Sequence, residues 1–152
     1  MARPELVLQL NYPEDLTYNY YIMSLKEKVI LIVDDDFDYL FQMKFQIENW
    51  GYKVITAESQ KEAEEMLKTM KPDLAILDLM MESEDSGFVL SYKLKKLYPD
   101  VPIIIATAVS AETGFSFGIR SDEEKKWIKA DLYLEKGIRP EQLKTEIEKL
   151  IC

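Results

Sequence analysis

Residues able to take part in phosphoryl chemistry stand at the ends of four separate, mostly apolar segments of the sequence. Asp34 and Asp35 follow segment 29–33, and Asp78 follows segment 73–77. Thr107 follows segment 102–106, and Lys136 lies two residues after segment 131–134. Carboxylates that are crowded together raise one another's pKa or bind a cation. An oxygen-rich site suits Mg²⁺, which takes one or two carboxylates and is completed by a substrate phosphate. The set therefore predicts Mg²⁺-dependent transfer of a phosphoryl group.

Asp78 is the candidate nucleophile, because it stands alone at the end of its segment. An aspartate can attack phosphorus when a metal ion and an ammonium group neutralise the charge on the phosphoryl oxygens. Asp34 and Asp35 are the candidate metal ligands. Thr107 would donate a hydrogen bond to a phosphoryl oxygen, and Lys136 would pair with the phosphate charge. These roles require the five side chains to converge in the fold.

The segments that carry these residues are predicted strands, and helical patterns alternate with them. The predicted strands cover residues 29–33, 53–57, 73–77, 102–106 and 131–134. Strands that alternate with helices form a parallel sheet with helices on both faces, since each crossover is right-handed. In such sheets the binding site lies beyond the carboxyl ends of the strands. All the candidate residues fall at that edge.

Helix signals follow each predicted strand. They are an apolar repeat at Phe37, Leu40, Phe41, Phe45 and Ile47, a capping box at Ser59 and Glu62, a helical pattern over 86–97, a cap at Ser121 with Glu124, and Pro140 at the start of a last helix. We expect the leucine and methionine stripes of these helices to face the core.

The composition limits the possible partners and chemistry. The 152 residues carry a formal net charge of −9, which opposes binding to nucleic acid or to an anionic membrane. No apolar run is long enough to span a bilayer and no secretion signal is evident, so we expect a cytoplasmic protein. The chain has no histidine, and its single cysteine is Cys152, which excludes an internal disulfide. We predict an N-terminal extension over residues 1–25 and one domain over 26–152.

Four stretches of the sequence resemble the signature segments of two-component response regulator receiver domains. These stretches are Ile-Leu-Ile-Val-Asp-Asp-Asp at 30–36, Leu-Asp-Leu-Met-Met at 77–81, Ile-Ile-Ile-Ala-Thr-Ala at 103–108 and Asp-Leu-Tyr-Leu-Glu-Lys at 131–136. The resemblance covers roughly residues 27–151. It implies a flavodoxin-like (βα)5 fold, a doubly wound parallel sheet in the order 2-1-3-4-5.

The resemblance also implies roles for individual residues. Asp78 would be the phosphoacceptor, with Asp35 as a direct Mg²⁺ ligand, Asp34 acting through water, and the backbone carbonyl of Met80 as a further ligand. Thr107 and Tyr133 would form a switch pair that reshapes the surface of the fourth helix, fifth strand and fifth helix. The phosphodonor would be a histidine kinase or a histidine phosphotransfer protein. Output would pass to an effector protein or through a homodimer, and the chain itself would not be an enzyme.

Three features depart from the family pattern. Glu82 stands where proline is usual, Gly137 follows Lys136 where proline is typical, and the segment 107–136 is several residues longer than usual. With Glu84 and Asp85, Glu82 makes an acidic rim that would slow an anionic phosphodonor. Met80 and Val109 occupy positions that tune the access of water in the family, and their apolar side chains predict slow self-dephosphorylation.

Two alternatives from other functional classes remain open at the level of sequence. The first is a receiver-fold interaction module that is never phosphorylated, which Glu82, Gly137 and the long segment would favour. The second is a phosphohydrolase of the haloacid dehalogenase type, which also uses a nucleophilic aspartate and Mg²⁺. That family places threonine or valine four residues after its first aspartate, whereas Asp38 stands four residues after Asp34.

Overall fold

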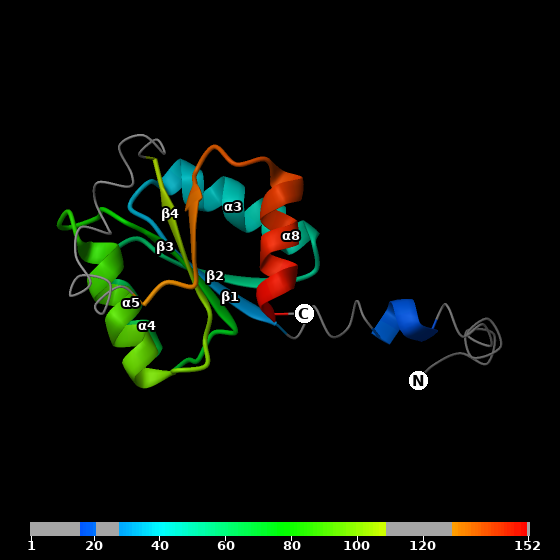
Figure 1. Cartoon of the computed structure of the whole chain (residues 1–152), viewed down its shortest axis with the longest axis horizontal. Helices are drawn as coiled ribbons and strands as arrows, with labels where there is room; N and C mark the ends of the chain where they lie inside the picture. The colour runs from blue at the N-terminus through cyan, green and yellow to red at the C-terminus, as the bar shows by residue number, and fades with distance from the viewer. Residues whose placement is uncertain (1–15, 21–27, 109–128, 152) are drawn as a thin grey trace.

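A computed structural model describes residues 16–20, 28–108 and 129–151, and its centre is a five-stranded parallel sheet. The strands are β1 (Val29–Val33), β2 (Lys53–Ala57), β3 (Leu74–Asp78), β4 (Ile103–Thr107) and β5 (Leu132–Glu135). Their order across the sheet is β2-β1-β3-β4-β5, and every neighbouring pair is parallel (Figure 1). The predicted flavodoxin-like sheet and its strand order are confirmed.

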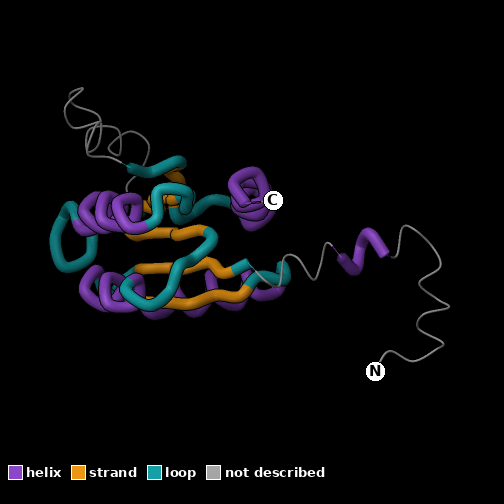
Figure 2. Tube along the Cα trace, turned by 90° about the horizontal axis from the view of Figure 1, so that it is seen from below, coloured by secondary structure: helices purple, strands orange, loops and turns teal. Residues whose placement is uncertain are grey.

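Helices cover both faces of this sheet. They are α3 (Phe37–Asn49), α4 (Gln60–Leu67), α5 (Ser86–Leu97) and α8 (Pro140–Ile151). One core cluster joins α3 and α8 to Ile30, Ile32, Ile76 and Ile104, and a second joins α4 and α5 to Leu31, Val33, Leu77 and Ile105. Successive side chains of a strand point to opposite faces, so both sets of strand residues are buried. The strands thus lie between two helical layers (Figures 1 and 2).

Three of the strands extend one residue further than predicted at their carboxyl ends. Asp78 pairs with Ala106, and Thr107 pairs with Glu135, so these residues still belong to the sheet. At the opposite edge, strand starts are tied by carboxylates. Asp73 Oδ2 accepts a hydrogen bond from the N–H of Val29 at 2.7 Å, at the start of β1. In the same way, Asp131 Oδ2 accepts one from the N–H of Ile103 at the start of β4. Asp78 and Thr107 are therefore held in place by the sheet itself.

Helix boundaries follow the predicted signals. Asp36 caps α3 by accepting hydrogen bonds from the N–H groups of Asp38 and Tyr39, and Ser59 caps α4 through the N–H of Glu62. After α3, Gly51 has a φ of 101°, a conformation that favours glycine. The chain is thereby turned from α3 into β2.

The apolar repeat predicted for α3 does not lie on one buried face. Phe37, Phe41 and Phe45 are each 65% exposed, while Leu40, Met43 and Ile47 are buried. Residues four apart lie on one helix face, since each residue turns the helix by about 100°. The three phenylalanines consequently form a row of their own, roughly a third of a turn from the buried face. We call Phe37, Phe41 and Phe45 the aromatic row.

Several predictions fall outside the described residues. The helix capped by Ser121 and Glu124 lies within 109–128, as does Val109, and most of the predicted extension 1–25 is also outside. Residues 16–20 are helical, with Leu16, Tyr18 and Tyr20 exposed. None of the helices in the described parts of the chain is both long and apolar enough to cross a membrane.

Candidate functional site

The carboxyl edge of the sheet brings the predicted site residues together. Asp34 follows β1 directly, and Asp78 ends the neighbouring strand β3. Next in the sheet, Thr107 ends β4, and its carbonyl accepts a hydrogen bond of 2.9 Å from the N–H of Lys136. Four adjacent strand ends thus place Asp34, Asp78, Thr107 and Lys136 at one edge of the sheet.

Three carboxylates form the centre of this site. Ligand oxygens of Asp34, Asp35 and Asp78 all lie within 4.8 Å of one another. Asp34 and Asp78 are buried, whereas Asp35 is exposed and opens the cluster to solvent. Asp34 Oδ1 accepts a hydrogen bond of 2.8 Å from the N–H of Asp36, which fixes the orientation of its carboxylate. The arrangement has the hard oxygen donors and the solvent-facing side that a hydrated divalent cation requires.

Lys136 partly compensates the negative charge of the cluster. Its Nζ lies 2.5 Å from Asp34 Oδ2 and 3.3 Å from Asp78 Oδ1. Burial lowers the pKa of Lys136, but the hydrogen bonds and charges of both aspartates outweigh this effect and raise that pKa. Apart from this ion pair, the buried Asp34 Oδ2 accepts no hydrogen bond from the described residues. One ammonium group therefore serves two buried carboxylates.

Asp78 retains an unfavourable environment for its charge. Burial, followed by the charge of Asp34, raises the pKa of Asp78 to about 6, although Lys136 acts in the opposite direction. A cation bound to the cluster would relieve this cost, because it would attract the ionised form. The oxygen donors, the shortage of positive charge and the access at Asp35 together fit Mg²⁺. A carboxylate with a pKa perturbed by burial and by a charged neighbour is also a feature of functional sites.

Met80 belongs to the loop between β3 and α5, which approaches the site closely. The N–H of Gly87 donates a hydrogen bond of 2.8 Å to the carbonyl of Leu79. A Cβ at Gly87 would lie 2.3 Å from the backbone oxygen of Asp78, so only glycine allows this approach. The start of α5 thus packs against the end of β3. The role of the Met80 carbonyl as a metal ligand stays a prediction.

The predicted switch residues lie on the same face of the sheet. Tyr133 of β5 pairs with Ile105, and Thr107 lies two residues further along β4. Tyr133 is 42% exposed, and its ring contacts Phe88 of α5 edge-on at 6.5 Å between centroids. Burial of the remaining surface raises the pKa of Tyr133 to about 12. The placement suits a ring that can turn inward, but the coupling of the two residues stays a prediction.

Glu82 has a structural role that sequence reasoning missed. Its carboxylate accepts hydrogen bonds from the first N–H groups of α4, those of Gln60 at 2.8 Å and Lys61 at 3.1 Å. Burial alone would raise the pKa of Glu82, but these hydrogen bonds together outweigh that effect and lower the pKa. Glu82 and Gln60 are 22 residues apart, so no local pattern in the sequence reveals the contact. Glu82 ties the β3–α5 loop to α4, and its negative charge is stabilised at the N-terminus of that helix.

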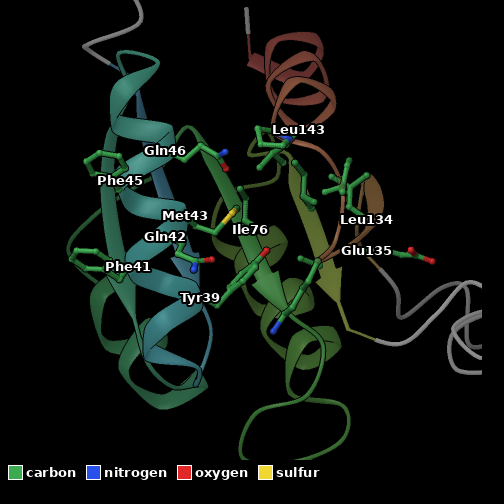
Figure 3. Close-up of a pocket in the computed structure, with 15 residues that line it drawn as sticks. Tyr39, Phe41, Gln42, Met43, Phe45, Gln46, Ile76, Leu134, Glu135 and Leu143 are labelled. Carbon is green, nitrogen blue, oxygen red and sulfur yellow. The ribbon is translucent and has the colours of Figure 1, made fainter.

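Tyr39 was also missed. The Nζ atom of Lys136 lies 4.6 Å from the centroid of the Tyr39 ring. The two residues line one end of a groove of about 440 Å³ between α3 and α8, whose floor includes Ile76, Ile104 and Leu143. Figure 3 shows Tyr39 extending from α3 into this groove. The other departure from the family pattern, Gly137, has open space around it.

Comparisons with known proteins agree with the geometry of the site. A sequence model described as the response regulator receiver domain matches residues 30–148. The alkaline phosphatase synthesis transcriptional regulatory protein PhoP of Bacillus subtilis is 30% identical over 124 residues, which cover 82% of this chain and 48% of PhoP. The phosphate regulon transcriptional regulatory protein PhoB of Pseudomonas aeruginosa is 32% identical over 126 residues, covering 82% of this chain and 52% of PhoB. The chain thus spans about half the length of these relatives.

Solved structures show the same fold. The CheY-like receiver domain protein from Methanospirillum hungatei has a TM-score of 0.67 and 29% identity, covering 80% of this chain and 91% of its own. The response regulator TrrA from Thermotoga maritima, solved in complex with Mg(2+)-BeF, has a TM-score of 0.66 and 32% identity, covering 81% of this chain and 98% of TrrA. The TrrA complex contains magnesium, the ion that the acidic cluster of this chain would fit.

Proposed function

The chain belongs to the response regulator receiver domain family, and we propose that it is the phosphoacceptor of a two-component phosphorelay, modified on Asp78 in the presence of Mg²⁺. The observation that carries the proposal is the position of Asp78 at the end of β3. Its buried carboxylate lies beside Asp34 and Asp35 and 3.3 Å from Lys136. This combines a nucleophile with a fixed positive charge and a set of oxygen donors for a cation.

The phosphoryl group would be transferred by direct attack of Asp78. A carboxylate oxygen of Asp78 forms a bond to phosphorus, while the bond from phosphorus to the nitrogen of a phosphohistidine breaks and the imidazole leaves. In the same way an acyl phosphate such as acetyl phosphate loses its carboxylate. Lys136 neutralises charge on the phosphoryl oxygens, and Thr107 donates to one of them. Asp78 is consumed in one turnover, so the reaction is a signalling event rather than enzymatic catalysis.

The proposed metal ligands are Asp34, Asp35, Asp78 and the Met80 carbonyl, with Asp34 acting through water. A bound Mg²⁺ supplies charge neutralisation at the phosphoryl oxygens. The N–H of Asp36 orients the buried carboxylate of Asp34, and a hydrated ion would enter on the side of the exposed Asp35. The ammonium of Lys136 is then free to turn from its carboxylate partners toward the phosphoryl group.

The phosphoryl group would be read out through Thr107 and Tyr133. The new charge on Asp78 attracts the Thr107 hydroxyl, and the Tyr133 ring turns inward from its half-exposed position. This would reshape a surface that includes β5 and α8, together with the helix predicted within 109–128. A downstream effector protein that binds this altered surface would receive the signal.

The phosphodonor, a histidine kinase or a histidine phosphotransfer protein, would dock on the aromatic row. Phe37 begins α3 directly after the acidic cluster, and Phe41 and Phe45 continue the row along the helix. Clustered exposed apolar side chains of this kind mark protein interaction sites. A partner that covered the row would present its phosphohistidine at the adjacent site. Phe41→Ala should therefore slow transfer from a phosphorylated protein donor and leave transfer from acetyl phosphate at the wild-type rate.

Intact-protein mass spectrometry after incubation with Mg²⁺ and acetyl phosphate tests the central proposal. We expect one phosphoryl adduct that is labile in alkali, absent from Asp78→Ala and present in the control variant Asp100→Ala, whose side chain is exposed and remote from the cluster. A wild-type protein that gains no adduct at saturating donor and Mg²⁺ would refute the proposal. The interaction module without phosphorylation would then be the better description.

A further inference from the structure

We propose that Tyr39 is a positioning residue for Lys136, whose ammonium group it holds over the face of its ring at the phosphoacceptor site. The inference deepens the proposed function and rests on it for its effect on phosphoryl transfer, although the contact itself can be tested separately. The distance of 4.6 Å between Lys136 Nζ and the Tyr39 centroid is within the range of a cation–π interaction. Tyr39 is half-buried, which reduces the competition from water.

The backbone positions of both residues are well defined. Tyr39 is the third residue of α3, and its N–H is held by the Asp36 cap at 3.2 Å. Lys136 is fixed at its N–H by the carbonyl of Thr107, and the N–H of Ile138 donates to Glu135 at 3.1 Å in the turn that follows. The two elements face each other across the groove of Figure 3. The contact therefore joins two rigid parts of the fold.

The side chain of Lys136 needs such a support because its backbone anchor does not determine the position of Nζ. A lysine side chain has four rotatable bonds and loses much rotamer freedom when its amine is fixed. In the structure the closest carboxylate oxygen to Nζ is Asp34 Oδ2, at 2.5 Å, and Asp78 Oδ1 is further away, at 3.3 Å. Without the Tyr39 ring, the ammonium group of Lys136 would stay with the carboxylate of Asp34, its closer partner. The ring of Tyr39 attracts the ammonium group whichever carboxylate that group contacts, and so holds it between the two carboxylates.

The support becomes important when the carboxylates take up other partners. A cation at the cluster would compete with Lys136 for Asp34 and Asp78, because both are attracted to the same oxygens. The Tyr39 ring is not a metal ligand, so its attraction for the ammonium group is not lost. Lys136 would thus stay next to Asp78 and meet the incoming phosphoryl group. The hydroxyl of Tyr39 is not required, and burial and the nearby aspartates raise its pKa and keep it neutral.

The first test measures the contact without any phosphorylation. In proton NMR spectra, the ring current of Tyr39 should shift the Hε resonances of Lys136 upfield in wild type and Tyr39→Phe, but not in Tyr39→Leu. We expect the shift to persist through a titration with Mg²⁺. Its loss on addition of Mg²⁺, or its presence in Tyr39→Leu, would overturn the proposal whether or not the protein accepts phosphoryl groups.

The second test is a double-mutant cycle on the rate of phosphorylation by acetyl phosphate at saturating Mg²⁺. Tyr39→Leu should slow the reaction on the order of 5-fold, and Tyr39→Phe should restore most of the rate. In a Lys136→Met background, Tyr39→Leu should cause no further loss. An equal loss in both backgrounds would indicate a structural role for Tyr39 and refute the proposal. No adduct in the wild type would instead refute the proposed function and leave the NMR result to decide the positioning role.

Tyr98→Leu provides a matched control for the loss of a tyrosine. Tyr98 also has a lysine near its ring, with Lys71 Nζ at 6.0 Å from the centroid, but this pair lies away from the acidic cluster. We expect the rate of Tyr98→Leu to equal that of wild type. A loss as large as that of Tyr39→Leu would mean that the assay reports general destabilisation, and the positioning role would be rejected.

Discussion

Replacing Asp78 by asparagine should stabilise the metal-free protein above pH 6. The ionised carboxylate of Asp78 is buried beside Asp34, and its pKa rises from the ordinary 3.8 to about 6. Asparagine has nearly the same shape and carries no charge. Lys136 would keep its ion pair with Asp34 at 2.5 Å, so the substitution leaves no ammonium group without a partner. The variant thus removes an electrostatic cost and little else.

The size and the pH dependence of the effect follow from the change in pKa. Between the unfolded pKa near 3.8 and the folded pKa near 6, the folded state binds more protons than the unfolded state, so stability falls as pH rises through this window. The difference of about 2.2 pKa units corresponds to about 3 kcal/mol at most, since one unit is about 1.36 kcal/mol. The cost is fully present above pH 6 and absent below about pH 4.

Urea unfolding in EDTA at pH 5 and pH 7.5 measures this cost directly. We expect the free energy of unfolding of Asp78→Asn to exceed that of wild type at pH 7.5 and the difference to shrink at pH 5. The control Asp100→Asn removes an exposed carboxylate whose pKa Lys71 lowers, and its stability should stay close to that of wild type at both pH values. Added Mg²⁺ should stabilise the wild type more than Asp78→Asn. Equal stabilities in EDTA at pH 7.5 would refute the reasoning.

Three further predictions concern the segment that runs from Asp78 to the start of α5. Gly87→Ala should destabilise the fold, and thermal denaturation should show it, because the new Cβ would meet the Asp78 backbone oxygen at 2.3 Å. Glu82→Gln should lower the free energy of unfolding by roughly 0.5–1 kcal/mol, since the α4 N-terminus loses a charged cap; urea unfolding measures the change, and an unchanged midpoint would contradict it. The phosphoryl group on Asp78 should outlive acetyl phosphate in the same buffer, and Met80→Asn should shorten its half-life in a mass-spectrometric time course.

The sequence allowed the sheet, and the meeting of the aspartates at its carboxyl edge, to be predicted because both depend on regular local patterns. A strand buried on both faces is a continuous apolar run, as in Val29–Val33, and in a parallel sheet every such run ends at the same edge. Which side of α3 is buried could not be predicted, because helical periodicity groups residues into faces without saying which face is buried. Both Phe41 and Met43 are apolar, and only the packing of α3 against β1 and β2 makes Met43 the buried one.

The contacts of Tyr39 and Glu82 around the site could not be predicted from the sequence for a different reason. Tyr39 reaches Lys136 and Glu82 reaches Gln60 across elements that are distant in sequence. A tyrosine on a helix is usually assigned to packing, and a glutamate in a loop to solvent. Their roles arise only after the strand order has placed β5 beside β4 and the β3–α5 loop beside the start of α4. Predicting such contacts requires the relative positions of side chains and not only the order of elements.

The three consecutive aspartates at the end of β1 show how one short motif supplies three functions. Successive residues that leave a strand point in different directions, so equal side chains meet different surroundings. Asp34 turns into the sheet edge and pairs with Lys136, Asp35 faces solvent at the entrance of the acidic cluster, and Asp36 turns to the backbone and caps α3. The carboxyl group is the same in each case. Burial and direction make the first a partner of the lysine, the second an exposed carboxylate beside the acidic cluster and the third the start of the helix that carries Tyr39.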